Sequence, residues 1–256
     1  MLINRSLLKH EENIIHLTYK DIVMLKKEMI YRNPLVNLGY EHEDILPKGG
    51  LGAVMSHAGV GKTALLVQLA INTMLREKSI LHVSLQDAVS KVDIWYRELF
   101  QNIAANFDAA EIKEYWDKIQ PYRFIMTFRV ESFSVPTLEE RLTDLMQQNI
   151  FKPHTVIIDG LKFDEAGRGQ LVLLKELAEK YAMRIWFTVH EHRHETPADN
   201  GLPVSFLHVA DLFDVIVKLE AKAEDIYIKA LKGKSSGAKP HILLLDPATM
   251  LIKDSK

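Results

Sequence analysis

The sequence predicts an α/β protein with a mainly parallel central sheet flanked by helices. An apolar run leads through a glycine-containing turn into an amphipathic helical pattern over residues 51–74. Short, uniformly apolar runs then alternate with helical patterns as far as residue 190, as in strands buried on both faces of a parallel sheet. Three apolar runs separated by short polar turns follow, and they predict a C-terminal antiparallel meander.

The composition is that of an ordinary globular chain of 256 residues, of which 47% are hydrophobic and 26% charged. We expect a helical N-terminal extension over residues 1–34 and one α/β domain over residues 35–256. With a net charge of -2, the protein as a whole is not attracted electrostatically to nucleic acid or to an anionic membrane. The absence of cysteine excludes disulfides and thiolate metal sites. Because the N-terminus lacks a long apolar segment, we expect a cytoplasmic protein with no membrane partner.

The N-terminal extension contains one helical pattern, over residues 21–32, preceded by a capping-box pair at Thr18 and Asp21. Its apolar face suits packing on its own domain, and a partner-docking arm is the alternative. Pro34 ends this helix, because the residue before a proline avoids helical angles. Residues 34–50 are expected to form an irregular lead-in to the first strand.

The elements after the first helix are predicted from the same two patterns, short apolar runs for strands and helical spacing of apolar residues for helices. Strands are predicted over residues 79–85, 122–128, 154–160 and 184–190, and helices from about 88 to 100 and over 107–119, 134–148 and 169–183. Asp108 is the expected N-cap of the second of these helices. A polar, turn-rich loop covers residues 191–203, and the apolar runs of the meander fall within 211–220, 224–233 and 239–252.

The turn after the first strand reads SHAGVGKT and predicts a phosphate loop. Gly59 and Gly61 let the backbone N–H groups curl toward an anion at the N-terminus of a helix. Lys62 would reach the β/γ phosphates and Thr63 would hold Mg2+, although Ser56 stands where the motif has its first glycine. A plain turn could read this way by chance, but the flanking strand and helix favour the phosphate loop. The predicted nucleotide-binding residues are Ser56, His57, Ala58, Gly59, Val60, Gly61, Lys62, Thr63 and Ala64.

Other polar residues fall at the C-terminal ends of predicted strands, where open α/β sheets bind ligands. They are Gln86, Asp87, Asp159 and His190. Asp159 follows three apolar residues and is expected to complete, with Thr63, a hard-oxygen site for Mg2+. An aspartate before a glycine is also a common turn, and the phosphate loop favours the metal role.

Histidines alternate at His190, His192 and His194, so an extended chain would place them on one side. This pattern could hold a metal, but a polar loop without fixed geometry argues against that interpretation. His57 is interpreted as an exposed loop residue rather than a nucleotide contact.

The series of motifs resembles the RecA superfamily, and within it the DnaB-type helicase motor and the KaiC and RadA group. The resemblance covers residues 45–252. The segments that carry it are PKGGLGAVMSHAGVGKT, ILHVSLQD, TVIIDG, LVLLKELAEKYAMRIWFTVHEHR and IYIKALKGKSSGAKPHILLLD. Only the first is specific by itself, and the collinear order carries the assignment.

The resemblance implies a RecA-like core that binds ATP and Mg2+ near a subunit interface in a homo-oligomeric ring or filament. Gln86 stands where these families have a general-base glutamate, which implies slow hydrolysis, and Asp87 is the alternative base. His190 stands where the helicases have a sensor glutamine. Lys232 and Lys234 match positions from which the family inserts fingers into the neighbouring subunit, and a solvated hairpin turn is the equal alternative.

Three functions are consistent with this sequence. An ATP-binding P-loop ATPase with slow hydrolysis is favoured, and a non-hydrolysing ATP sensor or scaffold is the first alternative. A helicase- or recombinase-like DNA motor is the second. Its nucleic-acid loops would be residues 161–169 and 191–201, and neither has the basic, aromatic-interleaved character that single-strand binding requires.

Overall fold

The computed structural model describes residues 27, 30, 33–38, 40, 44–163, 167–192, 195, 197–233 and 242–253. The helix predicted over residues 21–32 lies mostly outside the described residues, as do His194 and Lys234. Within the described part, no helix is both long and apolar enough to pass through a bilayer.

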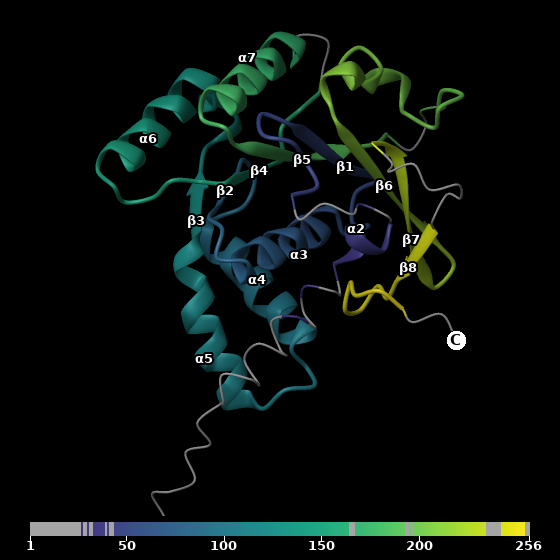
Figure 1. Cartoon of the computed structure of the whole chain (residues 1–256). Coiled ribbons are helices and arrows are strands. Elements are labelled where there is room, and N and C mark those ends of the chain that lie inside the picture. The colour runs from purple at the N-terminus through teal and green to yellow at the C-terminus, as the bar shows by residue number, and fades with distance from the viewer. Residues whose placement is uncertain are drawn as a thin grey trace, which may run out of the picture.

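The described strands form one eight-stranded sheet with the order β3-β2-β4-β5-β1-β6-β7-β8 (Figure 1). Their bounds are β1 Leu51–Ser56, β2 Ile80–Ser84, β3 Arg123–Thr127, β4 Thr155–Asp159, β5 Arg184–His190, β6 Val215–Lys222, β7 Asp225–Lys232 and β8 Ile242–Leu245. Neighbours from β3 to β6 pair in parallel, whereas β6–β7 and β7–β8 are antiparallel. The predicted α/β class, parallel sheet and terminal meander are confirmed.

Helices cover both faces of the sheet, with α3, α4 and α5 on one and α6 and α7 on the other (Figure 1). Their bounds are α2 Pro34–Asn37, α3 Lys62–Leu75, α4 Val89–Ile103, α5 Ala109–Ile119, α6 Val135–Gln147 and α7 Gly167–Lys180, with short 3-10 helices η1 Gln120–Tyr122, η2 Val130–Ser132, η3 Val204–Phe206 and η4 Ala210–Leu212. The hydrophobic core has two parts, one on each face of the sheet, because successive strand side chains point to opposite faces. Val54 of β1 packs on the α3 side, while Ala53 and Met55 pack on the opposite side.

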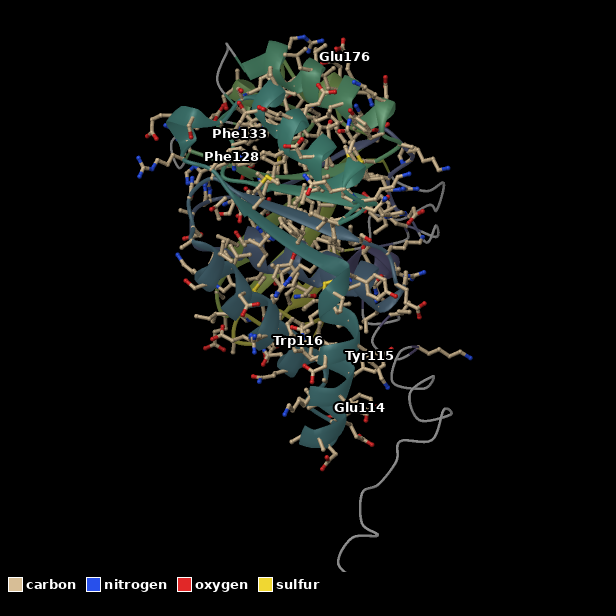
Figure 2. The ribbon with its side chains drawn as sticks, turned by 90° about the vertical axis from the view of Figure 1, so that its left-hand side faces the viewer. Glu114, Tyr115, Trp116, Phe128, Phe133 and Glu176 are labelled. Atoms are coloured by element: carbon tan, nitrogen blue, oxygen red, sulfur yellow. The ribbon has the colours of Figure 1, made fainter. Side chains whose placement is uncertain are left out.

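Local sequence explains where the helices begin. Asp108 accepts a hydrogen bond from the Ala110 N–H and forms a capping box with Glu111. The predicted N-cap at Asp108 is confirmed. Figure 2 shows α5 projecting from the main body, and Trp116 fastens it to Phe100 of α4 at a ring-centroid distance of 5.2 Å.

The lead-in before β1 differs from the prediction. Residues 34–37 form the short helix α2 instead of irregular chain. Asn33 has the extended angles expected before a proline, but its side chain accepts a hydrogen bond from the Leu35 N–H. Pro34 then occupies the first helical position, where a missing N–H costs nothing. The proline therefore begins a new helix.

Strand register brings distant polar residues to one edge of the sheet. Ser56 at the end of β1 lies opposite His190 of β5, and Ser84 at the end of β2 lies opposite Asp159 of β4. Since all four strands run in parallel, the loops that leave them meet at their carboxyl ends.

Candidate functional site

The predicted phosphate loop lies between β1 and the N-terminus of α3. Gly59 and Gly61 have φ angles of 79° and 105°, which are left-handed conformations that favour glycine. A Cβ on Gly61 would collide with the thioether of Met250, which packs against the loop from the turn after β8. Both glycines are therefore required by the backbone path.

Lys62 lies across its own loop. Its Nζ donates hydrogen bonds to the carbonyl oxygens of Ser56 and His57, each at 2.9 Å, and to the Ser56 hydroxyl at 3.2 Å. Ser56, the departure from the usual motif, thus helps to hold the lysine. Burial lowers the pKa of Lys62, while Asp159 and Glu191 act in the opposite direction. The ammonium group is consequently held at the pocket by oxygen atoms of its own loop.

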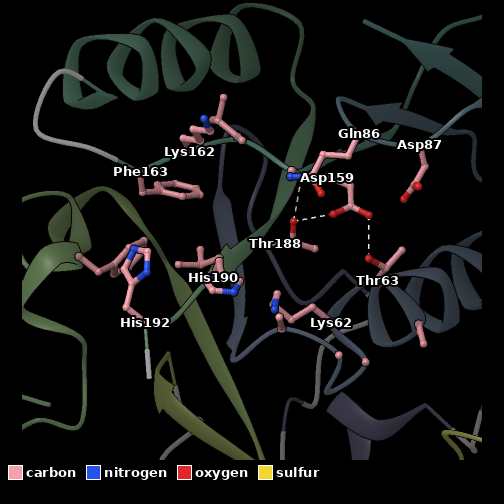
Figure 3. Close-up of a pocket in the computed structure, with 18 of the residues that line it drawn as sticks. Lys62, Thr63, Gln86, Asp87, Asp159, Lys162, Phe163, Thr188, His190 and His192 are labelled. Atoms are coloured by element: carbon pink, nitrogen blue, oxygen red, sulfur yellow. Dashed lines mark hydrogen bonds between the residues drawn. The ribbon is translucent and has the colours of Figure 1, made fainter. Parts of the chain in front are cut away.

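Asp159 connects three elements at the floor of the pocket. Thr63 of α3 donates to one carboxylate oxygen at 2.8 Å, and Thr188 of β5 donates to the other at 2.6 Å (Figure 3). The Gly160 N–H donates in turn to the Thr188 hydroxyl at 3.0 Å. Burial raises the pKa of the Asp159 carboxyl, although the hydrogen bonds from Thr188 and Thr63 lower it. The hydroxyl and carboxylate oxygens of Thr63 and Asp159 are the hard donors that Mg2+ prefers.

Gln86 and Asp87 line the same pocket, as predicted from the end of β2. Gln86 packs over Gly160, where a Cβ would lie 2.8 Å from the Gln86 Cγ. Asp87 accepts a 2.6 Å hydrogen bond from the Lys91 ammonium one turn along α4, and its own N–H donates to the Ser84 hydroxyl at 3.0 Å. The amide therefore faces the pocket beside a carboxylate that already has a cationic partner.

The histidines after β5 are divided between the pocket and the loop. His190 and His192 both line the pocket, and their ring centroids are 5.4 Å apart in an edge-to-face arrangement. His57 is exposed, as predicted, and its Nδ1 lies 3.1 Å from the Glu191 carbonyl oxygen. Among the residues that the structure describes, no group of three or more histidine and carboxylate side chains is arranged to hold a metal.

Lys232 is engaged within its own chain. Its Nζ donates to the Ala210 carbonyl at 2.9 Å and to the Asp211 carbonyl at 3.4 Å, so it caps the short helix η4. The side chain is therefore bonded within its own chain rather than solvated, and the finger role that the resemblance implies stays a prediction. Lys234, the second expected finger, is outside the described residues.

The pocket that joins these residues has a volume of about 840 Å³. Its lining includes residues that sequence reasoning missed, namely Trp95, Gly160, Leu161, Lys162, Phe163, Thr188, Val189, Pro203, Ser205 and Phe206. Thr188 could have been found, because it lies two positions before His190 and so shares its side of the strand. The others come from loops, from α4, from the short helix η3 and, for Val189, from β5, where no local pattern indicates a ligand.

No protein-family model matches this chain, and no curated protein matches it either. The chemistry of the pocket must therefore be inferred from its own residues. Lys62 and the glycine turn lie at the N-terminus of α3, beside the hydroxyl–carboxylate pair of Thr63 and Asp159. The same pocket is also lined by Gln86, Asp87, His190 and His192.

Proposed function

We propose that this chain is a RecA-like P-loop ATPase, related to the DnaB and KaiC group, that binds ATP with Mg2+ and hydrolyses it slowly. One observation carries the proposal: Thr63 donates to Asp159 at 2.8 Å although the two residues are 96 positions apart. The residue after the loop lysine thus meets the carboxylate at the end of β4, a strand that β5 separates from β1. A plain turn before a helix requires no such partner.

Each residue has a distinct task in this proposal. The N–H groups of the glycine turn and the positive end of the α3 dipole attract the phosphates. Lys62 leaves the carbonyls of Ser56 and His57 and pairs with the β/γ phosphates, exchanging neutral acceptors for charged ones. Mg2+ held by Thr63 and Asp159 would neutralise charge that develops on the phosphates.

Slow hydrolysis follows from the groups beside the reacting phosphate. The Gln86 amide lines the pocket but cannot take a proton from an attacking water. Asp87 could, but its carboxylate is already bound by Lys91. A protein with this pair is expected to dwell in its ATP-bound state.

Nucleotide binding is tested with Lys62→Ala. The change should weaken ATP-Mg2+ binding by about tenfold or more, because a charge-assisted contact to phosphate is lost, and should leave the melting curve native. Titration with a fluorescent ATP analogue measures the affinity, and Lys48→Ala, at an exposed lysine before β1, is the matched control. Unchanged affinity in a folded Lys62→Ala variant would reject the phosphate loop.

The slow rate is tested with Gln86→Glu. A positioned base contributes roughly 10² to 10⁴ in rate, and we expect a gain of about tenfold because the surroundings are not adapted to a carboxylate. Single-turnover phosphate release measures it. The contrary outcome has three parts: phosphate release by the wild type is fast, Asp87→Asn abolishes it, and Gln86→Glu changes it little. That result would make Asp87 the base and the chain an active motor.

A non-hydrolysing ATP sensor is the second candidate, and the Gln86 amide is the observation that favours it. This function predicts tight ATP binding with no phosphate release in the wild type. A homo-oligomer with nucleotide near the subunit interface belongs to either proposal. DNA remodelling has no support from the charge of the loops.

A further inference from the structure

The C-terminal turn after β8, residues 246–251, contacts the glycine turn of residues 56–63 from outside the pocket. Met250 packs its thioether so closely against Gly61 that a Cβ on Gly61 would overlap the Met250 methyl group. Met250 is 8% exposed, belongs to the same core as the buried residues of α3, and does not line the pocket. Its side chain therefore reaches the glycine turn without facing a bound ligand.

Hydrogen bonds fix the backbone of the C-terminal turn on both sides of the thioether. The Met250 N–H donates to the Asp246 carbonyl at 2.7 Å, and the Asp246 N–H donates to the Leu251 carbonyl at 2.9 Å. The Met250 carbonyl accepts a hydrogen bond from the amide of Gln68, a 4% exposed side chain of α3. The helix that begins at the glycine turn thus also holds the residue that packs against it.

The backbone of Met250 is unfavourable for a residue with a side chain. Its φ of 59° lies in the left-handed region, which glycine adopts more readily. The other described non-glycine residues with positive φ have small or polar side chains, and they are Glu77, Asn149, Ala182 and Ala223. The turn by itself does not require a methionine here. What the methionine adds is its contact with Gly61.

The two ends of the glycine turn are held in different ways. At its start, the Ser56 carbonyl accepts a hydrogen bond from the Glu191 N–H at 3.0 Å. At its end, Gly61 begins α3 in a left-handed conformation and has no side chain to cap the helix. A thioether makes many dispersion contacts and adapts to an irregular surface. Met250 thus supplies packing at the end that lacks a side-chain cap, directly before Lys62.

We propose that Met250 is a positioning residue for nucleotide binding, whose thioether holds Gly61 in the conformation that directs Lys62 and Thr63 into the pocket. The proposal rests on the proposed ATP-binding function. Because Met250 lies outside the pocket, its loss should lower the fraction of molecules in which the glycine turn is ready to bind. The apparent affinity falls in proportion to that fraction, while the contacts within the complex stay the same.

The first measurement needs no nucleotide. Trypsin cuts after Lys62 when the glycine turn and the start of α3 open, whereas it cuts after Arg184, 7% exposed in β5, when the sheet unfolds. Met250→Ala should raise the rate of cleavage after Lys62 by about tenfold relative to the rate after Arg184. Met250→Leu should restore most of the protection, because leucine and methionine have similar volumes. Fragment masses identify the two sites.

Two further variants separate positioning from stability. Met250→Gly removes the thioether and also relieves the left-handed strain, so it should be more stable than Met250→Ala and still open the glycine turn. It also serves as the test if Met250→Ala does not fold. Met126→Ala is the matched control, because Met126 is 8% exposed too but packs in the core on the other face of the sheet. This control should lower the melting temperature without favouring cleavage after Lys62.

The second measurement uses ATP-Mg2+. Met250→Ala should raise the dissociation constant by about fivefold, because fewer molecules have the glycine turn in its binding conformation. The single-turnover rate at saturating ATP-Mg2+ should not change, since the bound nucleotide selects the same conformation of the turn. Met250→Leu and Met126→Ala should bind as the wild type does.

The outcomes separate the two proposals. Cleavage after Lys62 that neither Met250→Ala nor Met250→Gly accelerates, or that Met126→Ala accelerates equally, would overturn the positioning role. An unchanged dissociation constant with a slower single turnover would overturn it as well. A wild-type protein that binds no ATP-Mg2+, while cleavage after Lys62 still responds to Met250 as expected, would overturn the proposed function and leave the contact between the two turns supported.

Discussion

The carboxylate of Asp159 is a costly group to bury, and the chain buries it with a hydroxyl on each oxygen. Burial still dominates, because the pKa of Asp159 is raised above its ordinary value. In the fold without nucleotide, this residue therefore reduces stability at neutral pH. A bound divalent cation would reverse that balance.

Asp159→Asn should accordingly raise the free energy of unfolding of the nucleotide-free protein by roughly 1 kcal/mol at neutral pH. Because the folded-state pKa lies above the unfolded value of about 3.9, the native state gains from protonation, a gain present at low pH and lost as pH rises through the folded pKa. The stability difference between the variant and the wild type should thus grow with pH from about 4 upward. Urea denaturation across this range measures it, with exposed Asp199→Asn as control; a destabilised variant would contradict the explanation.

Residues of the candidate site could be predicted where their type and local spacing carry the information. The glycine turn of residues 56–63 and Asp159 follow this rule, because strand and helix patterns flank them. The hydrogen-bond acceptors of Lys62 and the two hydroxyl groups that donate to Asp159 could not be predicted from the sequence. These contacts depend on the order of the strands in the folded sheet. Trp95 and Phe163 reach the pocket only through the path of α4 and of the loop after β4.

At the scale of elements, most predicted strands and helices are confirmed, because apolar periodicity reports burial and the buried faces are continuous. The exception is α2, where a side-chain cap at Asn33 converts a helix-stopping proline into a helix-starting one. Capping depends on one hydrogen bond, so its outcome is harder to predict than a periodic face.

The cap of α5 provides an element-scale prediction. Asp108→Ala removes the acceptor for the Ala110 N–H and half of the capping box with Glu111. The free energy of unfolding should fall by about 1 kcal/mol, because the freed donor loses its partner. Chemical denaturation measures the change, and Asp117→Ala on the same helix is the control. An equal loss of stability from the two substitutions would contradict the capping explanation.

At the scale of the whole molecule, Lys232 bears on assembly. Its bonds to η4 predict that Lys232→Ala lowers the melting temperature and leaves ATP-dependent sedimentation unchanged. Lys234→Ala should preserve ATP binding by the isolated subunit and reduce any hydrolysis that requires assembly. Analytical ultracentrifugation with and without ATP-Mg2+, beside phosphate-release assays, distinguishes the two lysines. A chain that stays monomeric at high concentration with ATP-Mg2+ would remove the finger role from both.

The position of β1 in the sheet affects folding during synthesis, because the ribosome makes the chain from its N-terminus. β1 leaves the ribosome before both of its neighbours, β5 and β6, which follow only after three other strands. A growing chain that stops before residue 215 carries the glycine turn on a strand with an unpaired edge. The turn that brings Met250 against Gly61 arrives later still. A nascent chain of this fold therefore cannot assemble the pocket until the residues up to Phe206 have been made, long after the synthesis of Lys62 and Thr63.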